Sequence, residues 1–390
     1  MEKRLKVLKN EFYKHFGDDG QKIRIFLAPG RVNLIGEHTD YNGGFVLPVA
    51  IDRNIIVAAS PNRENVLRLQ SLNFDNTAIY NLNEIKYEAK DRWANYPKGV
   101  AKLLQEKGYR IQGMDLLFEG NIPIGSGLSS SAAIEVVSCL TITTLSDIEI
   151  DKKEIPILCQ KVENEFIGMR CGIMDQFVIT FAKQGMALFL DCRNLEYEHI
   201  PVSSSDVAII ITDTRKKRKL IDSEYNTRRR QCEEGVKILK QYITGIKQLR
   251  DITPEQFERY KNKLPSTVCK RCEHIVYEND RVIRAKELLK NNKIQEFGNL
   301  MYESHESLNK LFQVSCFKLD TIVKITENIK GVIGSKMTGA GFGGCVVSLV
   351  NKESRDTFVE NVSEKYQKKF KIKPDFYICN VEDGVKEINN

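Results

Sequence analysis

The sequence predicts an α+β protein with two domains, and three observations support this prediction. The chain has 390 residues, which is longer than most single domains. In the first half, a short apolar segment (114–118), a Gly/Ser turn and a long apolar segment (132–145) follow one another as strand, loop and helix. In the second half, an apolar segment (207–212) predicts the first strand of a second domain. A predicted helix (352–368) followed by a predicted strand (376–379) indicates an α+β layer in this half.

A segment of linker composition, Pro-Val-Ser-Ser-Ser at 201–205, lies between these halves. We therefore assign residues 1–200 to an N-terminal domain and residues 201–390 to a C-terminal domain. The sequence contains no internal repeat and no low-complexity segment that would argue for another division.

The composition is that of a globular protein without membrane segments. Hydrophobic residues make up 42% of the chain and charged residues 28%. No apolar run approaches the roughly 20 residues that cross a bilayer, and the N-terminus lacks the apolar core of a signal peptide. The ten cysteines are scattered as in reduced cytosolic enzymes, and the single CxxC, Cys269 with Cys272, has no second pair to complete a zinc site. We expect a cytoplasmic protein with no membrane partner.

The net charge of +7 is partly concentrated in two basic runs, Arg215–Lys219 and Arg228–Arg230. A basic run is usually a solvated face, and no helix-turn-helix, zinc-finger or RNP motif accompanies these two. We therefore expect no nucleic-acid partner. An anionic substrate such as a nucleotide would use the same charge.

The chain begins with a predicted amphipathic helix over residues 2–17. Its apolar residues recur on one face, namely Leu5, Leu8, Phe12 and Phe16. Gly17 is a C-terminal stop signal. An alternating segment at 23–27 predicts the first strand, and residues 45–60 predict two more. A further helix is predicted to start at Trp93, which either packs in the core, as the sequence favours, or stacks on a base.

The segment 28–44 holds the densest group of functional side chains and reads Ala-Pro-Gly-Arg-Val-Asn-Leu-Ile-Gly-Glu-His-Thr-Asp-Tyr-Asn-Gly-Gly. Four glycines and a proline interrupt it, so we expect a shaped loop. Arg31, Glu37, His38 and Asp40 together offer the donors and acceptors that a polyhydroxylated ligand needs. A hairpin with a salt-bridged turn would also explain the pattern, and the spacing alone does not decide between them.

The segment 121–135, Asn-Ile-Pro-Ile-Gly-Ser-Gly-Leu-Ser-Ser-Ser-Ala-Ala-Ile-Glu, joins the strand at 114–118 to the helix at 132–145. The first N–H groups of a helix lack partners and its dipole is positive there, so an anion is stabilised. Glycines also let backbone amides approach a phosphate closely. An ordinary capped helix after a glycine turn is the alternative, and the loop alone leaves both open. No lysine follows the second glycine, so this is not a GxxxxGK[ST] phosphate loop.

Two acidic residues follow in the chain. Glu163 lies on a predicted helix whose apolar face is formed by Ile155, Leu158, Val162 and Phe166. Asp175 lies at the start of an apolar helix at 177–181, where a lone Asp is usually an N-cap. Further along, Lys-Met-Thr-Gly-Ala-Gly-Phe-Gly-Gly-Cys (336–345) precedes a buried strand (346–350). Its four glycines imply a tight loop against another backbone or a ligand.

The three glycine-rich segments, in this order, resemble those of the superfamily of galactokinase, homoserine kinase, mevalonate kinase and phosphomevalonate kinase. The first, GRVNLIGEHTDYNGG, resembles the galactokinase signature almost letter for letter. The resemblance continues in WANYPKGV, CGIMDQF, SEYNTRRRQCEE, CEHIVYENDRV and SHESLNKLFQVSCFKLD, so it spans nearly the whole chain. The sequence departs from the family pattern at Phe45, Ser126 and Arg170, none of which is a catalytic position.

The resemblance implies roles for individual residues. Asp175 would accept the proton of the sugar C1 hydroxyl, and Arg31 would stabilise charge in the transition state. The implied substrate-binding residues are Glu37, His38, Thr39, Asp40 and Tyr225. The implied nucleotide-binding residues are Ser71, Trp93, Gly125, Ser126, Gly127, Leu128, Ser129, Ser130 and Ser131. Ser131 and Glu163 would hold Mg²⁺.

The fold implied by the resemblance is an N-terminal mixed α/β domain and a C-terminal ferredoxin-like α/β sandwich, with the active site between them. The implied reaction is phosphorylation of D-galactose at C1, with ATP as co-substrate, Mg²⁺ as cofactor and a monomer or weak homodimer as the assembly. A kinase of N-acetylgalactosamine or another sugar is the alternative within the class. A catalytically silent galactose sensor is the alternative outside it. Such a sensor is expected to lose loop hydroxyls or the acidic base, which are present here.

Overall fold

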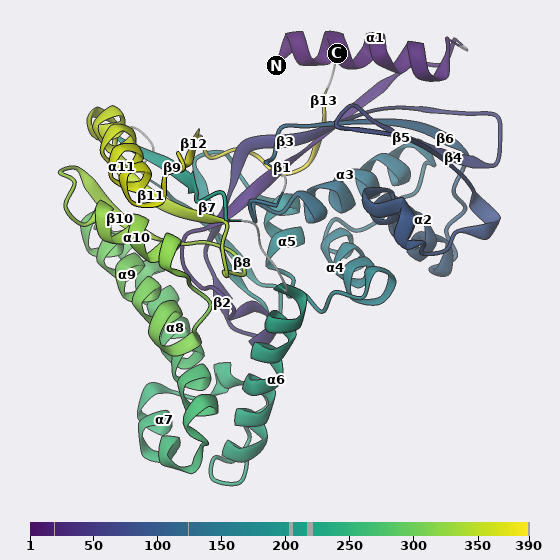
Figure 1. Ribbon diagram of the computed structural model, residues 1–390. Coiled ribbons are helices and arrows are strands. Elements are labelled where there is room, and N and C mark those ends of the chain that lie inside the picture. The colour runs from purple at the N-terminus through teal and green to yellow at the C-terminus, as the bar shows by residue number, and fades with distance from the viewer. Residues whose placement is uncertain (19, 124, 203–205, 217–220, 389–390) are drawn as a thin grey trace.

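The computed structural model describes residues 1–18, 20–123, 125–202, 206–216 and 221–388. Within them the chain forms three sheets with helices packed against them (Figure 1). One continuous apolar cluster contains residues from both halves of the chain. Ser203–Ser205 of the expected linker and Lys217–Lys219 of the first basic run lie outside the described residues. No helix in the described part of the chain is long and apolar enough to cross a membrane.

The first sheet has six strands in the order β13-β1-β3-β6-β4-β5. Their bounds are Lys386–Ile388 (β13), Arg24–Asn33 (β1), Pro48–Pro61 (β3), Met114–Gly120 (β6), Val66–Ser71 (β4) and Phe74–Asn81 (β5). Neighbouring strands are antiparallel except for β4 and β6, which run parallel. Side chains alternate between two apolar clusters, so that Ile25 and Leu27 of β1 pack with α1 (Glu2–Phe16) and Phe26 packs in the main core.

Four helices cover the other face of this sheet (Figure 1). They are α2 (Asn95–Glu106), α3 (Ser130–Leu145), α4 (Glu154–Lys161) and α5 (Met174–Phe181). Helix α3 lies on β1 and β3 and contacts the other three helices. Because it is enclosed nearly all round, its sequence is apolar on every side rather than amphipathic.

The second half contains a four-stranded antiparallel sheet in the order β10-β11-β9-β12. Its elements are β9 (Val207–Asp213), α6 (Ile221–Leu239), α7 (Pro254–Tyr260), α8 (Ser266–Lys290), α9 (Ile294–Ser307), α10 (Phe317–Thr326), β10 (Val332–Met337), β11 (Cys345–Asn351), α11 (Arg355–Phe370) and β12 (Asp375–Cys379). The strand order and the placement of helices before β10 and between β11 and β12 confirm the expected ferredoxin-like topology.

A small third sheet, β2-β7-β8, connects the halves. It consists of β2 (Phe45–Val46), β7 (Met186–Asp191) and β8 (Tyr197–Pro201). Helix α8 of the second half contacts both β2 and β8. The loop before β2 therefore lies against elements of both halves.

One predicted boundary is wrong. We expected a loop over 28–44, but β1 continues to Asn33 and the loop begins only at Leu34. Gly30 does not end β1. Strand β3 pairs with β1 on both sides of a register shift between Pro29 and Gly30, so the strand continues through this glycine. Arg31 is consequently held by a buried strand. This fixes the position of its guanidinium more firmly than a loop would.

The end of the described chain also departs from a simple division at residue 200. After β12 the chain returns to the first sheet, where Val381 forms an isolated bridge with Ile51 and β13 pairs with β1. The domain limits 1–200 and 201–390 therefore stay a proposal, with residues 381–388 packed on the N-terminal domain.

Candidate active site

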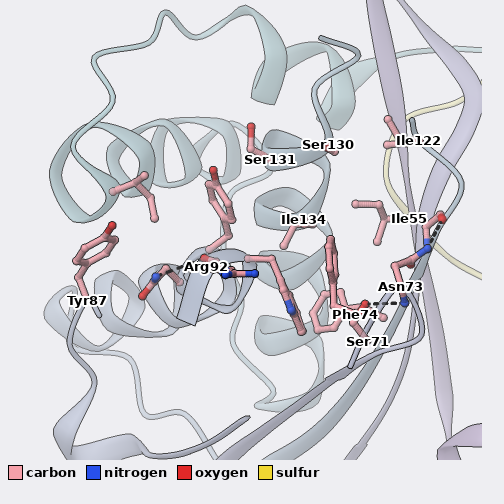
Figure 2. Close-up of a pocket in the computed structure, with 16 residues that line it drawn as sticks. Ile55, Ser71, Asn73, Phe74, Tyr87, Arg92, Ile122, Ser130, Ser131 and Ile134 are labelled. Atoms are coloured by element: carbon pink, nitrogen blue, oxygen red, sulfur yellow. Dashed lines mark hydrogen bonds between the residues drawn. The ribbon is translucent and has the colours of Figure 1, made fainter. Parts of the chain in front are cut away.

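Two cavities meet at the N-terminus of α3. The first, of about 380 Å³, is lined by Ser71, Trp93 and other residues of the first half (Figure 2). The second, of about 230 Å³, is lined by Arg31, Asp175 and residues of the loop before β2. Ser130 and Ser131 line both cavities. A ligand extending past these two hydroxyls would occupy both.

Arg31 and Asp175 form the centre of the second cavity. The Nε and Nη2 atoms of Arg31 donate to the two carboxylate oxygens of Asp175 at 2.7 and 2.6 Å, and the Ser129 hydroxyl donates to the same carboxylate. An N-cap, the usual role of a lone Asp at a helix start, is not the role of Asp175. Ile173 is the N-cap of α5 and makes no side-chain cap bond, while Asp175 lies in the first turn. A bidentate charged partner outcompetes a backbone N–H for the carboxylate.

The loop before α3 is anchored to β1. The Nη1 atom of Arg31 donates to the carbonyl of Gly127 at 2.6 Å, and the backbone N–H of Arg31 donates to that of Leu128 at 3.2 Å. Gly125 and Gly127 have φ of 74° and 84° and line the second cavity with Ser129. Leu128 and Ser126 are buried outside both cavities, so they support the loop rather than face a ligand.

The loop before β2 supplies the other polar groups of the second cavity. Glu37, His38 and Asp40 line it, and Tyr225 of α6 faces them from the second half. Thr39 does not line it. The hydroxyl of Thr39 lies 2.8 Å from the carbonyl oxygen of Gly36 and 2.6 Å from that of Phe45, so this residue holds the loop together.

Burial sets the charge of these groups. Burial raises the pKa of Glu37 to about 7, although the nearby Lys336 opposes the shift. Burial, followed by repulsion from Asp175, raises the pKa of Asp40 to about 6. Burial also lowers the pKa of His38 well below its usual value, so the ring is neutral at pH 7. Its Nδ1 atom contacts the hydroxyl of Tyr41 at 3.0 Å, and its Nε2 atom has no hydrogen-bond partner among the described residues.

Ser131 and Glu163 suit a divalent cation. Both line the second cavity, and Glu163 lies in a π-helical turn, Val162–Ile167, that continues α4. Burial raises the pKa of Glu163, while hydrogen bonds from Cys171 and Ser131 and repulsion by Asp175 also act on it. An added cation would offset this repulsion between Glu163 and Asp175. No cluster of three His, Cys, Asp or Glu ligands exists in the described residues, and Mg²⁺ characteristically binds one or two protein oxygens plus phosphates.

Two residues that no sequence motif assigned to the site contact Glu163 or each other: Gln176, which lines the second cavity, and Glu135, which does not. The Nε2 atom of Gln176 is 3.1 Å from Glu135 and 3.4 Å from Glu163. Burial, and then the charge of Glu163, raises the pKa of Glu135 well above its usual value. The only available signal for Gln176 was its place next to Asp175 in the chain.

Ser71 and Trp93, the two residues of the first half that the resemblance assigns to the nucleotide outside the Gly/Ser loop, both line the first cavity, and Figure 2 labels Ser71. Trp93 lies in a 3₁₀ turn, Ala89–Ala94, just before α2, and is only 8% exposed. Its ring lies nearly parallel to that of Phe74, with an interplanar angle of 17° and ring centroids 6.3 Å apart. Trp93 is therefore both a core residue and part of the cavity wall. Phe74 and Arg92 also line this cavity, although no sequence motif pointed to them.

Family models match three parts of the chain. The galactokinase galactose-binding signature matches residues 10–61, the N-terminal domain of GHMP kinases matches 95–183, and the C-terminal domain of GHMP kinases matches 285–368. The first of these segments contains Arg31 and the loop before β2, and the second contains the Gly/Ser loop, Glu163 and Asp175.

Full-length relatives are similar to this chain. A galactokinase of Fusobacterium nucleatum is 44% identical over 97% of both chains, and one of Bacillus subtilis is 43% identical over 98% of both. Among solved structures, a Lactococcus lactis galactokinase complexed with galactose has a TM-score of 0.95 at 36% identity, covering 98% of this chain and 100% of that one. A mevalonate kinase of Methanococcus jannaschii has a TM-score of 0.65 at 24% identity, covering 94% and 100%, and shares the fold.

Proposed function

The chain belongs to the galactokinase family, and we propose that it transfers the γ-phosphoryl group of ATP to the C1 hydroxyl of D-galactose, giving galactose 1-phosphate and ADP. One observation carries the assignment of the residues. A cavity lined by Arg31, Asp175 and the polar loop meets a second cavity lined by Trp93, and the two share Ser130 and Ser131. A sugar in one and a nucleotide in the other would bring C1 and the γ-phosphate together at the start of α3.

Asp175 accepts the proton of the C1 hydroxyl, and Arg31 orients the carboxylate of Asp175. The two hydrogen bonds from Arg31 fix the plane of this carboxylate, and the hydroxyl of Ser129 donates a further bond to its Oδ2 atom. The transferred phosphoryl group passes through a loose transition state, so the protein contributes mainly position and charge. The guanidinium of Arg31 adds positive charge beside the reacting oxygen.

Galactose is recognised by groups that still have hydrogen-bonding capacity. Glu37 Oε1 and His38 Nε2 are buried and have no hydrogen-bond partner within the described part of the chain. Asp40 and Tyr225 line the same cavity. Each sugar hydroxyl needs such a donor or acceptor once it leaves water, so these groups select hydroxyl orientation.

The triphosphate lies along the loop from Gly125 to Ser131, whose last residues begin α3. The free N–H groups and the positive dipole at this helix end stabilise the phosphates. Ser131 and Glu163 would hold Mg²⁺, which neutralises charge between phosphate oxygens when bound. We place Trp93 and Ser71 at the adenine and its sugar. The protein is proposed to act in the cytoplasm as a monomer or weak homodimer.

A coupled ADP-release assay with galactose, glucose, N-acetylgalactosamine and arabinose tests the function. We expect galactose to be preferred over glucose, which has the inverted C4 hydroxyl, by a factor of up to about 10⁴ in kcat/KM. Equal values for the two sugars would contradict the sugar assignment. Turnover of N-acetylgalactosamine alone would favour the other sugar kinase, and galactose binding without ADP release would favour the silent sensor.

A further inference from the structure

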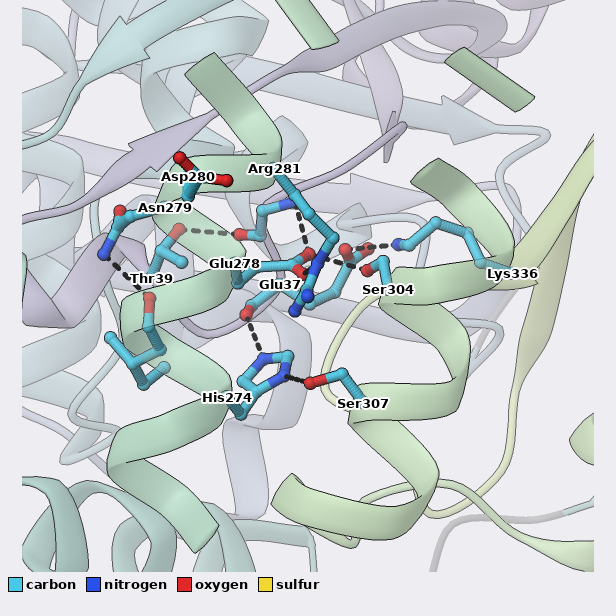
Figure 3. A network of polar contacts seen from close by, with 12 residues as sticks. Glu37, Thr39, His274, Glu278, Asn279, Asp280, Arg281, Ser304, Ser307 and Lys336 are labelled. Carbon is cyan, nitrogen blue, oxygen red and sulfur yellow. Dashed lines mark hydrogen bonds and ion pairs between the residues drawn. The ribbon is translucent and has the colours of Figure 1, made fainter. Parts of the chain in front are cut away.

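A buried network of charged side chains lies behind the galactose-binding loop (Figure 3). It is formed by residues of the second half: Lys336 on β10, His274, Glu278 and Arg281 on α8, and Ser304 and Ser307 on α9. Lys336 and Glu278 are 0% exposed. Charged groups this deeply buried are costly unless they are paired, so their partners indicate what they do.

The network holds the loop by its backbone. The carboxylate of Glu278 accepts the N–H of Gly36 at 2.9 Å and the hydroxyl of Ser304 at 2.6 Å. The Nε2 atom of His274 lies 3.1 Å from the carbonyl oxygen of Glu37. Arg281 pairs with Glu278 at 2.7 Å. Helix α8 therefore fixes the peptide group that precedes Gly36 and the one that follows Glu37.

Lys336 holds the side chain of the same residue. Its Nζ atom donates to Oε2 of Glu37 and, at 2.9 Å, to the carbonyl of Met337 (Figure 3). The other carboxylate oxygen, Oε1, is buried with no hydrogen-bond partner among the described residues, and Glu37 lines the galactose cavity. Lys336 itself does not line it. One oxygen is thus used to fix the side chain and the other is left to accept a ligand hydroxyl.

We propose that Lys336 is a positioning residue for galactose recognition: it binds Oε2 of Glu37 and directs Oε1 toward the sugar. The inference rests on the proposed function, because it takes galactose to be the ligand of this cavity. It assigns part of the sugar selectivity to a residue of β10, about 300 positions along the chain from Glu37.

The charges around Glu37 support this role. Burial raises its pKa to about 7, the charge of Lys336 is the largest opposing influence, Glu278 raises the pKa further, and Arg31 lowers it. His274 faces the loop from α8, but burial lowers its pKa to about 4, so its ring is neutral at pH 7. Removing Lys336 would raise the pKa of Glu37 further, so that less of this side chain is ionised at pH 7 and its charge-assisted bond to a sugar hydroxyl weakens. Raising the pH would restore the carboxylate.

The test is a double-mutant cycle of Lys336→Met and Glu37→Gln, read as the galactose KM at pH 7 and pH 9. We expect Lys336→Met to raise the galactose KM by about 10- to 100-fold at pH 7 and by less at pH 9, with the ATP KM unchanged within about threefold. Adding Lys336→Met to Glu37→Gln should raise the galactose KM little further, because the group through which Lys336 acts is already neutral. Additive effects, or a loss that does not depend on pH, would overturn the proposal.

Two further variants separate positioning from packing. Lys336→Arg keeps a cation and should recover most of the galactose affinity. Lys98→Met is a matched control, since Lys98 is 1% exposed and pairs with Asp91 at 2.5 Å but lines neither cavity. It should lower thermal stability without changing the galactose KM.

The cycle remains informative if Lys336→Met alone does not fold. Glu37→Gln with Lys336→Met leaves no unpaired carboxylate, so the double variant should unfold at a higher temperature than Lys336→Met. If the double variant unfolds at the same temperature as Lys336→Met or lower, Lys336 and Glu37 do not act as a pair. Wild-type protein in the same assay distinguishes the two proposals. Failure of wild type to phosphorylate galactose contradicts the proposed function, whereas an active wild type with a normal Lys336→Met contradicts only this inference.

Discussion

Asp175 is oriented by Arg31 and Ser129, and this arrangement leads to the first prediction. We expect Asp175→Asn to reduce kcat by about 10² or more, because a positioned proton acceptor typically contributes 10²–10⁴-fold. Galactose and ATP should still bind, since the amide occupies the same space. Steady-state kinetics and calorimetric titration of both substrates would measure these effects.

Ser129→Ala is the comparison for that variant. It removes one contact to the carboxylate and leaves the acid in place, so its effect on kcat should be much smaller. Because Arg31 keeps its bond to Gly127 in the Asp175→Asn variant, we expect the protein to stay folded with a modestly lower Tm. An Asp175→Asn variant that retains more than a tenth of wild-type kcat would assign the proton to another group.

Asp40 gives a prediction about pH. Its pKa is raised from 3.8 to about 6, first by burial and then by Asp175. Ionisation of Asp40 therefore destabilises the sugar-free fold as the pH rises through 6, and has no such effect below the unfolded pKa. We expect Asp40→Asn to stabilise the sugar-free protein at pH 8, by at most about 3 kcal/mol, and to have little effect near pH 4.

Chemical denaturation at both pH values would measure this difference. The same variant should raise the galactose KM, because the amide loses the charged acceptor. A variant less stable than wild type at pH 8 would show that the Asp40 carboxylate has a compensating partner in the free protein.

The proposed metal ligands give a third prediction. Ser131→Ala and Glu163→Gln remove one hard oxygen ligand each, and both should raise the KM for Mg·ATP or reduce kcat while leaving galactose binding nearly intact. Titration of nucleotide in the presence and absence of Mg²⁺ would separate metal binding from phosphate binding. If calorimetry showed both variants losing affinity for galactose rather than for nucleotide, the metal assignment would be wrong.

At the scale of elements, the segment before α5 approaches the galactose loop at Gly172. A Cβ atom there would lie 1.8 Å from a carboxylate oxygen of Asp40. We expect Gly172→Ala to push this carboxylate out of place and raise the galactose KM at least about tenfold, roughly the loss of one charged hydrogen bond. Kinetics at saturating ATP would measure it.

A second background tests the cause of that effect. In an Asp40→Ala variant the carboxylate is absent, so it cannot collide with a Cβ atom at position 172. Gly172→Ala should therefore lower the free energy of unfolding less in the Asp40→Ala variant than in wild type. Equal costs in the two backgrounds would indicate that Gly172 is needed for its own backbone and not for the space beside Asp40.

Most elements could be predicted from local patterns. The helix predicted over 2–17 forms as α1, and the strand and helix flanking the Gly/Ser loop form as β6 and α3. The errors occur where tertiary contacts override local signals. Pairing with β3 extends β1 through Gly30, and Asp175 bonds the guanidinium of Arg31 instead of capping α5, as a lone Asp at a helix start usually does.

At the scale of the whole molecule, the site could be predicted only in part. The resemblance named Arg31, Asp175 and the polar loop, and the structure brings them into one cavity. It did not reveal Lys336, because no local pattern relates a lysine at the end of β10 to a glutamate in a loop of the first half. Nor did it reveal Gln176, whose contacts with Glu135 and Glu163 depend on the placement of α3 and α4 beside α5.

Residues 381–388, which return to the first sheet after β12, give a prediction at the scale of the whole molecule. The N–H of Gly384 donates to Ala182 at 2.9 Å, that of Val385 donates to Ile179 at 2.7 Å, and both acceptors lie at the end of the helix that carries Asp175. We expect a chain ending at Asp383 to lose roughly 2–5 kcal/mol of unfolding free energy through the lost burial and hydrogen bonds.

Denaturant unfolding would measure that loss, and kcat should fall with it while the ATP KM stays nearly constant. Arg24→Ala removes the two 2.7 Å bonds to Glu387 and the contact of the guanidinium with the Phe26 ring but keeps the β13 backbone, so it should cost far less. A shortened chain with wild-type stability would mean that β13 is dispensable.

The pairing of β1 with β13 also has a consequence for synthesis. The two partners Arg24 and Glu387 are 363 residues apart in the chain. At 5–20 residues per second, a ribosome needs roughly 20–70 s to make the intervening polypeptide. During that time one edge of β1 is exposed to any other strand, including the same strand of a neighbouring nascent chain. Yield in the cell should therefore depend on translation speed and on chaperones that shield this edge.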